Sequence, residues 1–362
     1  MNFFKSLLSL FLLSSSFACS SNEDFRTDVY FTEEDLPNPI QLQGKKYNIP
    51  EIINPRGLML KDQYAVVFER KSIESNKIHV IDLKTGKYLR SKGKDGMGPG
   101  EVTVITQIED VGEEGMVWTY DPEMRIFSKF DLSDSSLLAV DQIKSPETSY
   151  FLTSTTWTGT KSILGNSVDG WTKYLHLNID GDTLALFGSW QDMIANRELP
   201  RGIKPDELDA NFVSSLFQGV LKTSKDGKKA VMAGISIDYI DVVDLNDNSI
   251  LTIYGPSQEI QDFRIGHWDG FQVPDLASNS TERYLDVYPG EKSFFALFFG
   301  KPYRELGSPE SLNRVFEFDY NGNILNQYQL DYPVYGIAVD EENKAIYSVT
   351  VDREPNLVRF DY

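Results

Sequence analysis

Histidine and cysteine, two residue types that often perform acid–base, nucleophilic or metal chemistry, are scarce in this sequence. Its 362 residues include three histidines and one cysteine, Cys19. One cysteine cannot form a disulfide framework or a cysteine-built zinc site, and three histidines leave little material for a histidine metal cage. His79 and His176 stand inside β-rich runs, where we expect hydrogen-bonded core histidines. Catalysis by a histidine pair is therefore not expected.

The charged residues exclude nucleic acid as a partner and leave Ca²⁺ open as a ligand. The chain has 35 Lys and Arg against 54 Asp and Glu, a net charge of −19 at pH 7. Nucleic-acid binding through phosphate neutralisation is excluded because the electrostatic interaction has the wrong sign. Acidic and amide side chains are the oxygen ligands that Ca²⁺ favours, but their spacing here selects no particular set. No other cofactor is predicted.

The first 19 residues predict export and a lipid anchor. Lys5 precedes an apolar run from Leu7 to Leu13, the layout of a secretory signal and too short to cross a bilayer. Ser16-Phe17-Ala18-Cys19 resembles a bacterial lipobox, in which the cysteine is acylated and the preceding peptide is removed. We therefore expect a signal peptide over 1–18 and membrane attachment through Cys19.

The next segment is polar, acidic and contains proline, so residues 19–38 are predicted to be the acylated cysteine followed by a flexible tether. Its beginning, Ser20 to Asp24 (SSNED), resembles the surface-export signals of Bacteroidetes lipoproteins. We expect the protein to be anchored in the outer membrane. Both the periplasmic side and the cell surface fit the sequence. A monomer is expected.

One phrase, a short apolar strand that ends in aspartate, occurs six times in the remaining chain. The copies are KIHVIDLKTG, RIFSKFDLSD, YLHLNIDGD, YIDVVDLND, RVFEFDYNG and LVRFDY, with terminal residues Asp82, Asp131, Asp180, Asp244, Asp319 and Asp361. The residue before each aspartate is apolar, and in five copies so is the residue four before it. These two positions point to opposite faces of a strand. Both faces of the repeated strand are therefore predicted to be buried.

Six sheets buried on both faces, without crossover helices, predict radial stacking of blades. Two β-sandwiches, the alternative, would leave one face of each strand in solvent. We predict an all-β fold, a six-bladed propeller over 39–362, with the aspartate opening a turn after each third strand. The last copy stops at Tyr362 with no fourth strand. A strand from Ile40–Ile49 is expected to complete that blade and close the ring.

The chain resembles the TolB-like six-bladed propeller lipoproteins of Bacteroidetes. The resemblance is carried by the lipobox, GKDGMGPGEV (Gly93–Val102), FFALFFGKP (Phe294–Pro302) and the closing AIYSVTV (Ala345–Val351). It covers essentially the whole mature chain and implies the propeller fold and an envelope location. It implies no activity.

Long loops indicate which face of the propeller is functional. The long segments are Arg90–Val104, Gly188–Asn211, Gly255–Arg283 and Gly300–Asn313, and the propeller topology predicts all four on one face, with short turns on the other. Arg and Trp side chains are favoured binding anchors. The candidate binding residues on this face are Glu101, Arg197, Arg201, Arg264, His267, Trp268 and Arg304, with Glu101 also a candidate carboxylate at the mouth of the central channel.

Three functions remain open from the sequence. One of them is a structural or sensory envelope component without a small ligand, and the other two are more specific. The first of these two is a lipid-anchored envelope module that binds or scaffolds a protein, peptide or glycan through the long-loop face. The alternative is a metal-dependent lactonase- or esterase-type hydrolase with its site at the channel mouth. A hydrolase needs a convergent cluster of carboxylates and amides there, whereas a binding module needs an exposed aromatic or apolar surface on the loops.

Overall fold

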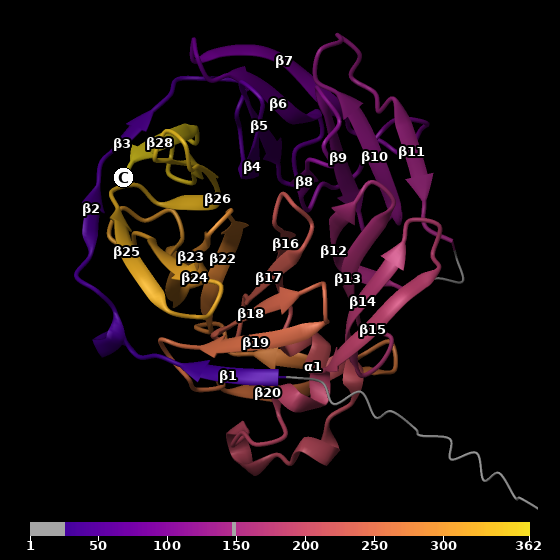
Figure 1. Cartoon of the computed structure of the whole chain (residues 1–362), viewed down its shortest axis with the longest axis vertical. Helices are drawn as coiled ribbons and strands as arrows, with labels where there is room; N and C mark the ends of the chain where they lie inside the picture. The colour runs from indigo at the N-terminus through magenta and orange to yellow at the C-terminus, as the bar shows by residue number, and fades with distance from the viewer. Residues whose placement is uncertain (1–25, 147–149) are drawn as a thin grey trace, which may run out of the picture.

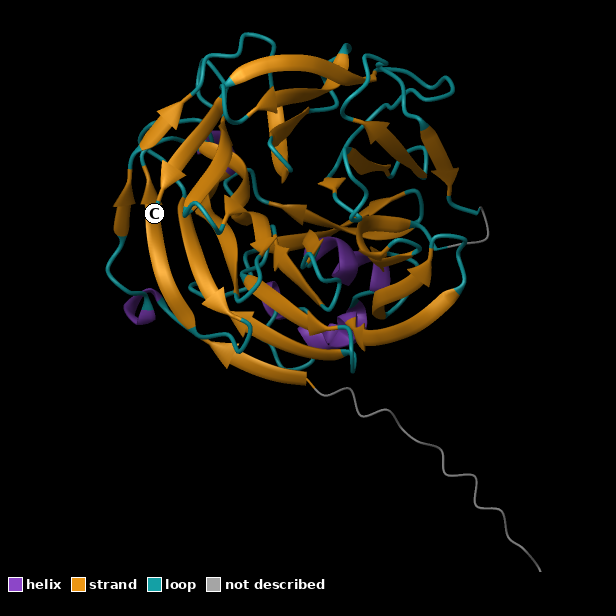
Figure 2. Ribbon diagram, turned by 45° about the horizontal axis from the view of Figure 1, so that its top comes forward, coloured by secondary structure: helices purple, strands orange, loops and turns teal. Residues whose placement is uncertain are grey.

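Six β-sheets surround a common axis (Figures 1 and 2). The computed structural model describes residues 26–146 and 150–362. Each sheet has four antiparallel strands, with the first strand innermost, and successive sheets follow one another round the ring. The predicted six-bladed propeller is confirmed. Cys19 and the predicted signal peptide lie outside the described residues.

The strands of the blades follow the order of the sequence. The first three blades are β4 (Pro55–Lys61), β5 (Tyr64–Glu69), β6 (Asn76–Asp82) and β7 (Lys87–Lys94); β8 (Ile108–Glu109), β9 (Met116–Asp121), β10 (Ile126–Asp131) and β11 (Asp141–Lys144); and β12 (Leu152–Gly159), β13 (Ser162–Ser167), β14 (Thr172–Asn178) and β15 (Thr183–Ser189). The other three are β16 (Gly219–Thr223), β17 (Lys229–Gly234), β18 (Tyr239–Asp244) and β19 (Ser249–Tyr254); β22 (Thr281–Pro289), β23 (Ser293–Pro302), β24 (Arg314–Asp319) and β25 (Ile324–Leu330); and β26 (Val334–Asp340), β27 (Ala345–Thr350), β28 (Leu357–Asp361) and β3 (Gly44–Lys46).

The repeated phrase is the third strand of every blade, and both of its faces are buried. Six apolar clusters lie between neighbouring blades. Ile78 of β6 and Phe130 of β10, for example, pack in the cluster between the first two blades. Because each sheet contributes to the cluster on either side of it, no blade can bury its apolar surface alone.

The aspartates of four copies open the turn that follows, as predicted. Asp82, Asp131, Asp244 and Asp319 accept backbone N–H groups two to four residues further on. In the last copy Asp361 instead accepts a hydrogen bond from Lys45 Nζ at 2.7 Å, so this aspartate joins the closing strand to the end of the chain.

The ring is closed by the N-terminal segment, within the range that the sequence indicated. Gly44–Lys46 (β3) pairs antiparallel with Val358–Phe360 of β28. A Cβ on Gly44 would lie 2.7–2.8 Å from side-chain atoms of Val358, Phe360 and Tyr332. Glycine is therefore required here by the close approach of the last blade's side chains.

The rest of the N-terminal segment differs from the prediction. Residues 26–38, expected to belong to a flexible tether, instead begin a strap that runs along the outer edges of two blades (Figure 1). β1 (Arg26–Tyr30) pairs parallel with β19, η1 (Glu33–Asp35) follows, and β2 (Ile40–Leu42) pairs parallel with β25. We call residues 26–46 the N-terminal strap.

A buried phenylalanine fixes the strap to the ring. Phe31 is 4% exposed and contacts Phe316 and Phe318 edge to face, with ring centroids 6.2 and 5.7 Å apart. Its backbone N–H donates to the Tyr254 carbonyl at 3.0 Å. The polar residues around it hid this anchor in the sequence, because one apolar side chain gives no periodicity.

The four long loops lie on one face by topology. Three connect the outer strand of a blade to the inner strand of the next, and the fourth connects β23 to β24; both kinds of connection leave the same end of the blades. β1 runs parallel to β19 and therefore ends on this face, which we call the long-loop face. Two loops carry further elements: η2 (Trp190–Met193), η3 (Pro200–Gly202), η4 (Pro205–Glu207) and α1 (Ala210–Leu216), and the hairpin β20 (Phe263–Trp268)–β21 (Phe271–Leu276). η5 (Tyr303–Glu305) begins the loop between β23 and β24.

We predict that Phe31→Ala destabilises the protein by about 3–4 kcal/mol, because the substitution removes a buried aromatic side chain and leaves a cavity. Chemical unfolding of the purified protein measures the loss. Thr27→Ala, an exposed position on the same strap, is the control and should change stability little. Equal effects of the two substitutions would contradict the anchoring role of Phe31.

Candidate functional site

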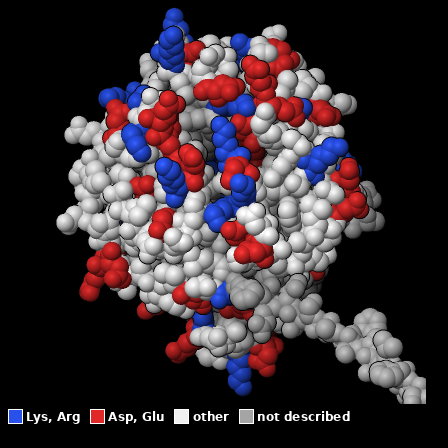
Figure 3. All heavy atoms as spheres, viewed as in Figure 1, with Lys and Arg blue, Asp and Glu red and all other residues white. Residues whose placement is uncertain are grey.

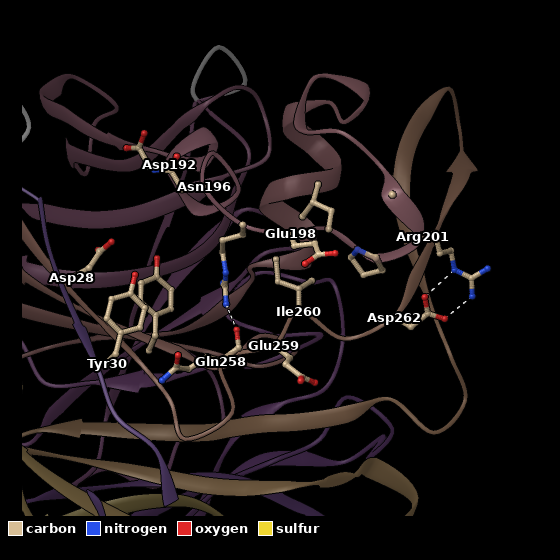
Figure 4. Close-up of a pocket in the computed structure, with 15 residues that line it drawn as sticks. Asp28, Tyr30, Asp192, Asn196, Glu198, Arg201, Gln258, Glu259, Ile260 and Asp262 are labelled. Carbon is tan, nitrogen blue, oxygen red and sulfur yellow. Dashed lines mark hydrogen bonds and ion pairs between the residues drawn. The ribbon is translucent and has the colours of Figure 1, made fainter.

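A cleft of about 660 Å³ opens at the rim of the long-loop face, above the fourth blade (Figure 4). One wall is the strap, with Asp28 and Tyr30. The other walls are the loop after β15 and the segment after β19. The lining residues are Asp28, Tyr30, Asp192, Asn196, Arg197, Glu198, Leu199, Pro200, Arg201, Gly202, Tyr254, Gln258, Glu259, Ile260 and Asp262. We call this the first cleft. Its volume is in the range of pockets that hold small ligands.

An aromatic stack forms one side of the first cleft. The rings of Tyr30 and Tyr254 are 5.2 Å apart between centroids and nearly parallel, at 22°. Arg197 lies on the Tyr254 ring, its guanidinium carbon 4.9 Å from the centroid. Tyr30 is 59% exposed. The stack therefore offers an open, rigid aromatic surface to whatever enters the cleft.

Polar side chains surround this aromatic surface. The carboxylates of Asp192, Glu198 and Glu259 have no hydrogen-bond or ion-pair partner among residues 26–146 and 150–362. Figure 4 shows Glu198 between the Asp28–Tyr30 side and the Arg201–Asp262 side of the cleft. Five acidic residues and two arginines line the cleft. Its acidic character favours a neutral or cationic ligand.

The two arginines of the first cleft have different environments. Arg201 pairs with Asp262 through two nitrogens, with Nε 2.8 Å from Oδ1 (Figure 4), and this guanidinium holds the pKa of the Asp262 carboxyl below its ordinary value. Arg197 donates from Nη2 to the Gln258 carbonyl at 2.6 Å. Its Nη1 is buried and has no partner within the described residues.

The long loops that form the cleft carry a small core of their own. Trp190, Leu199 and Leu208 are buried in the cluster shared by the third and fourth blades. Asp209 caps α1 by accepting the Phe212 N–H at 2.8 Å, and the hairpin packs on this helix, with Asn211 donating to the Gln272 carbonyl at 2.8 Å. Buried apolar anchors at intervals along the loop thus fix the cleft's wall.

Below the cleft an ion pair joins the third and fourth blades. Lys173 Nζ lies 2.6 Å from Asp241 Oδ2, and both side chains are buried. Tyr174 donates to the same carboxylate at 2.6 Å and Thr252 at 2.8 Å. Burial acts to raise the pKa of Asp241, but Lys173 and these hydroxyls outweigh it and lower that pKa. This satisfied network joins β14 of the third blade to β18 of the fourth.

The structure separates the residues that the sequence grouped as one binding face. Arg197 and Arg201 line the first cleft. Arg264, His267 and Trp268 lie on the hairpin, and Trp268, 76% exposed, is at its tip opposite Phe271, which is 56% exposed. Arg304 lines a separate depression of about 400 Å³ beside Tyr303 and Asp352.

Glu101 is not at the channel mouth. Its carboxylate accepts the Gly98 N–H at 2.8 Å and pairs with Lys94, while the adjacent Gly100 N–H donates to Gln142 of the outer strand β11 at 2.7 Å. These bonds hold the loop between the outer parts of the first and second blades. The expectation of a channel carboxylate is wrong because the GMGPGE turn directs this side chain back onto its own backbone.

Sequence reasoning missed Tyr30, Tyr254 and Asp28. The signal for the two strap residues was a short alternation in Asp28-Val29-Tyr30-Phe31, where polar or exposed positions alternate with more buried ones. Tyr254 was hidden as the last residue of an ordinary apolar strand. Parallel pairing of β1 with β19 brings these positions together across more than 220 residues, as the Arg26–Tyr254 contact shows.

Charged side chains also gather around the centre of the ring in the face shown in Figure 3. Two ion pairs join neighbouring blades at their inner strands: Lys222 of β16 pairs with Asp286 of β22 at 2.6 Å, and Lys61 of β4 pairs with Asp110, which follows β8, at 2.7 Å. Burial raises the pKa of Glu109 to about 7 despite hydrogen bonds from Thr156 and Trp157. In residues 26–146 and 150–362 no three His, Cys, Asp or Glu side chains are grouped to hold a metal ion.

The two histidines inside the blades are both hydrogen-bonded, as predicted, but only His79 is buried, and His176 is partly exposed. His79 Nε2 is 3.1 Å from Glu69 Oε1, and His176 Nε2 is 3.0 Å from the Thr158 hydroxyl. Trp157 and Trp190 are buried, and Trp171 packs against the same cluster as Trp190. Burial keeps His79, Trp157 and Trp190 from contact with a ligand.

The sequence matches the family described as TolB-like 6-blade propeller-like over residues 44–342, and the chain belongs to that family. Among solved structures it is similar to a Bacteroides fragilis protein described as exported, with a TM-score of 0.51, 12% identity and coverage of 92% of this chain and 98% of that chain. It is also similar to a member of the DUF4221 family from Bacteroides vulgatus, with a TM-score of 0.52, 9% identity and coverage of 89% and 96%. No curated protein matches.

These likenesses establish the fold alone. Within the described part of the chain, no helix has both the length and the apolar character needed to cross a bilayer.

A buried carboxyl supports the segment that borders the first cleft. Asp238 Oδ2 accepts the Ser257 N–H at 2.7 Å, and Oδ1 has no partner within the described residues. Burial raises the pKa of Asp238 to about 7, and the Ser257 N–H and Arg283 oppose that rise only in part. The segment from Pro256 to Ile260 thus rests on a group that changes charge near neutral pH.

We predict that Asp238→Asn stabilises the protein at pH 8, on the order of 2–4 kcal/mol. The unfolded chain loses this proton near the ordinary pKa of 3.8 and the folded chain near 7, so the wild-type protein loses stability as pH rises between those values. The variant's advantage should shrink as pH falls toward 4. Glu259→Gln, an exposed carboxyl of the segment that Asp238 supports, is the control, and unfolding curves at several pH values provide the measurement. An equal difference at pH 4 and 8 would show that Asp238 does not titrate in this way.

Proposed function

We propose that this propeller is an exported envelope protein, anchored in the outer membrane through acylated Cys19, that binds a glycan in the first cleft. The observation that carries the glycan proposal is the exposed Tyr30 ring, backed by Tyr254 and flanked by unpaired carboxylates. A sugar ring has an apolar C–H face that packs on an aromatic ring, and hydroxyls at its edge that donate to carboxylates. No cofactor takes part.

The charges of the cleft narrow the ligand class. Asp192, Glu198 and Glu259 accept hydrogen bonds from hydroxyl or ammonium groups, and the Asn196 and Gln258 amides supply both donors and acceptors. An acidic sugar would meet five acidic residues and only two arginines, one of them already paired with Asp262. We therefore propose a neutral or amine-bearing sugar as the ligand of the first cleft.

The direction of the strap supports a ligand outside the membrane. β1 begins at the short-turn end of the fourth blade and ends at Tyr30 on the long-loop face. The seven residue steps from Cys19 to Arg26 span at most about 25 Å when fully extended. An anchor at Cys19 would therefore keep the short-turn side of this blade near the bilayer and direct the first cleft away from it.

We predict that Tyr30→Ala weakens glycan binding by about tenfold, because loss of one stacking surface costs about 1–1.5 kcal/mol, while Tyr30→Phe preserves binding. The mature chain carrying Cys19→Ala would be screened on a glycan array and affinities measured by calorimetry. Trp268→Ala, the exposed aromatic of the hairpin tip, is the matched control. Binding that depends on Trp268 and not on Tyr30, or retention of acidic glycans only, would contradict the proposed site.

We predict that the wild-type protein partitions into the detergent phase of a membrane extract and that Cys19→Ala partitions into the aqueous phase, because the acyl chains supply the attachment. Cell fractionation followed by detergent-phase separation measures this. A substitution of Ser20 is the control. A Cys19→Ala variant that remains with the membrane would contradict lipid anchoring without bearing on the glycan site.

A further inference from the structure

A second cleft, of about 260 Å³, lies on the other side of the segment from Pro256 to Ile260. It is bordered by Glu33 of the strap and by the long-loop ends of strands from the fifth blade. Its lining residues are Glu33, Pro256, Ser257, Arg283, Phe298, Phe299, Gly300, Lys301, Leu312, Arg314 and Gln329. Three of these are cationic and one is acidic. The second cleft is therefore cationic in a chain whose net charge is −19.

One arginine of the second cleft already holds a carboxylate. Arg314 Nη1 and Nη2 each lie 2.7 Å from an oxygen of Glu33, a paired geometry that suits a planar carboxylate. The guanidinium lies against the stacked rings of Phe298 and Phe316, with its central carbon 5.1 and 5.0 Å from their centroids. Packing thus orients Arg314 independently of Glu33.

The Glu33 side chain is exposed enough for another carboxylate to replace it on Arg314. It is 59% exposed, whereas that of Arg314 is 21% exposed. It comes from the three-residue turn η1, where its neighbour Glu34 is also exposed. A carboxylate from solvent can therefore reach Arg314, and its exchange for Glu33 replaces one paired carboxylate contact with another.

The other two cations of the second cleft, Arg283 and Lys301, form no ion pair within the described residues, although Arg283 interacts electrostatically with the Asp238 carboxyl. The Nε of Arg283 is buried without an acceptor, and Asp238 Oδ1, the nearby orphan described above, lacks a donor. A buried N–H without an acceptor is costly. The cleft therefore has free donor capacity beside the donors that Glu33 uses.

We infer that the second cleft is a binding site for a carboxylate-bearing ligand, held by Arg314, Arg283 and Lys301, and that Glu33 occupies part of this site as a tethered competitor. The carboxylate of the ligand replaces that of Glu33 on Arg314. The other polar groups of the ligand contact Arg283 and Lys301. Phe298 and Phe299 supply apolar contact beside it. The site is distinct from the first cleft and does not depend on glycan binding there.

The test uses the mature chain carrying Cys19→Ala, alone and combined with Glu33→Gln. Calorimetry would measure affinity for D-glucuronate and for N-acetyl-alanyl-alanine, which present a carboxylate on a sugar and on a peptide end. D-Glucose and inorganic phosphate are the comparison probes. Glu34→Gln on the same turn is the matched control, and Arg283→Gln in the Glu33→Gln background tests the unpaired cation.

We expect Glu33→Gln to bind at least one carboxylate probe about tenfold more tightly than the unsubstituted chain, because the tethered competitor is gone. The probe that binds more tightly shows whether the natural carboxylate belongs to a sugar or to a peptide end. Arg283→Gln should remove most of this gain, and added salt should weaken binding. The inference is overturned if neither carboxylate binds the Glu33→Gln chain, if phosphate binds as tightly, if Glu34→Gln gives the same gain, or if Arg283→Gln has no effect.

Discussion

The burial of both faces of every blade is the constraint on which the rest of this structure depends. Each third strand ends with an apolar residue before its aspartate, and each apolar cluster is shared by two neighbouring sheets. A sheet in such an arrangement has no solvent face, so the sixth must pack against the first. An apolar cluster shared by the sixth and first blades meets this requirement. The pairing of β3 with β28 supplies the outer strand of the sixth blade.

Closure from the N-terminus has a second consequence, because the chain must reach β28 from outside the ring. It does so along the edges of the fourth and fifth blades, and Phe31 fixes its course between the two clefts. The strap thereby supplies Tyr30 to one cleft and Glu33 to the other. A segment used for closing the fold thus also forms the walls of both candidate sites.

The two clefts differ in charge although they share the segment from Pro256 to Ile260. The first is lined mainly by carboxylates around an aromatic stack, and the second by Arg283, Lys301 and Arg314. Below them, the Lys173–Asp241 pair and Asp238 are buried. The Asp241 carboxylate also accepts hydrogen bonds from Tyr174 and Thr252, whereas one oxygen of Asp238 has no donor within the described residues. The polar groups of the Lys173–Asp241 network are therefore compensated, whereas Asp238 and Arg283 next to the second cleft are only partly so.

The sequence by itself determined the repeat, the propeller, the closing strand near Gly44 and the face that carries the long loops, because these follow from local apolar patterns and from the order of strands. It could not place Tyr30 against Tyr254, Glu33 against Arg314 or Glu101 against its own loop. Only the tertiary structure decided these contacts, since parallel pairing at a sheet edge is set by one buried anchor, Phe31, and leaves no repeating pattern in the chain. The candidate sites consist of single contacts between distant parts of the chain, whereas the ring consists of contacts that recur in every blade.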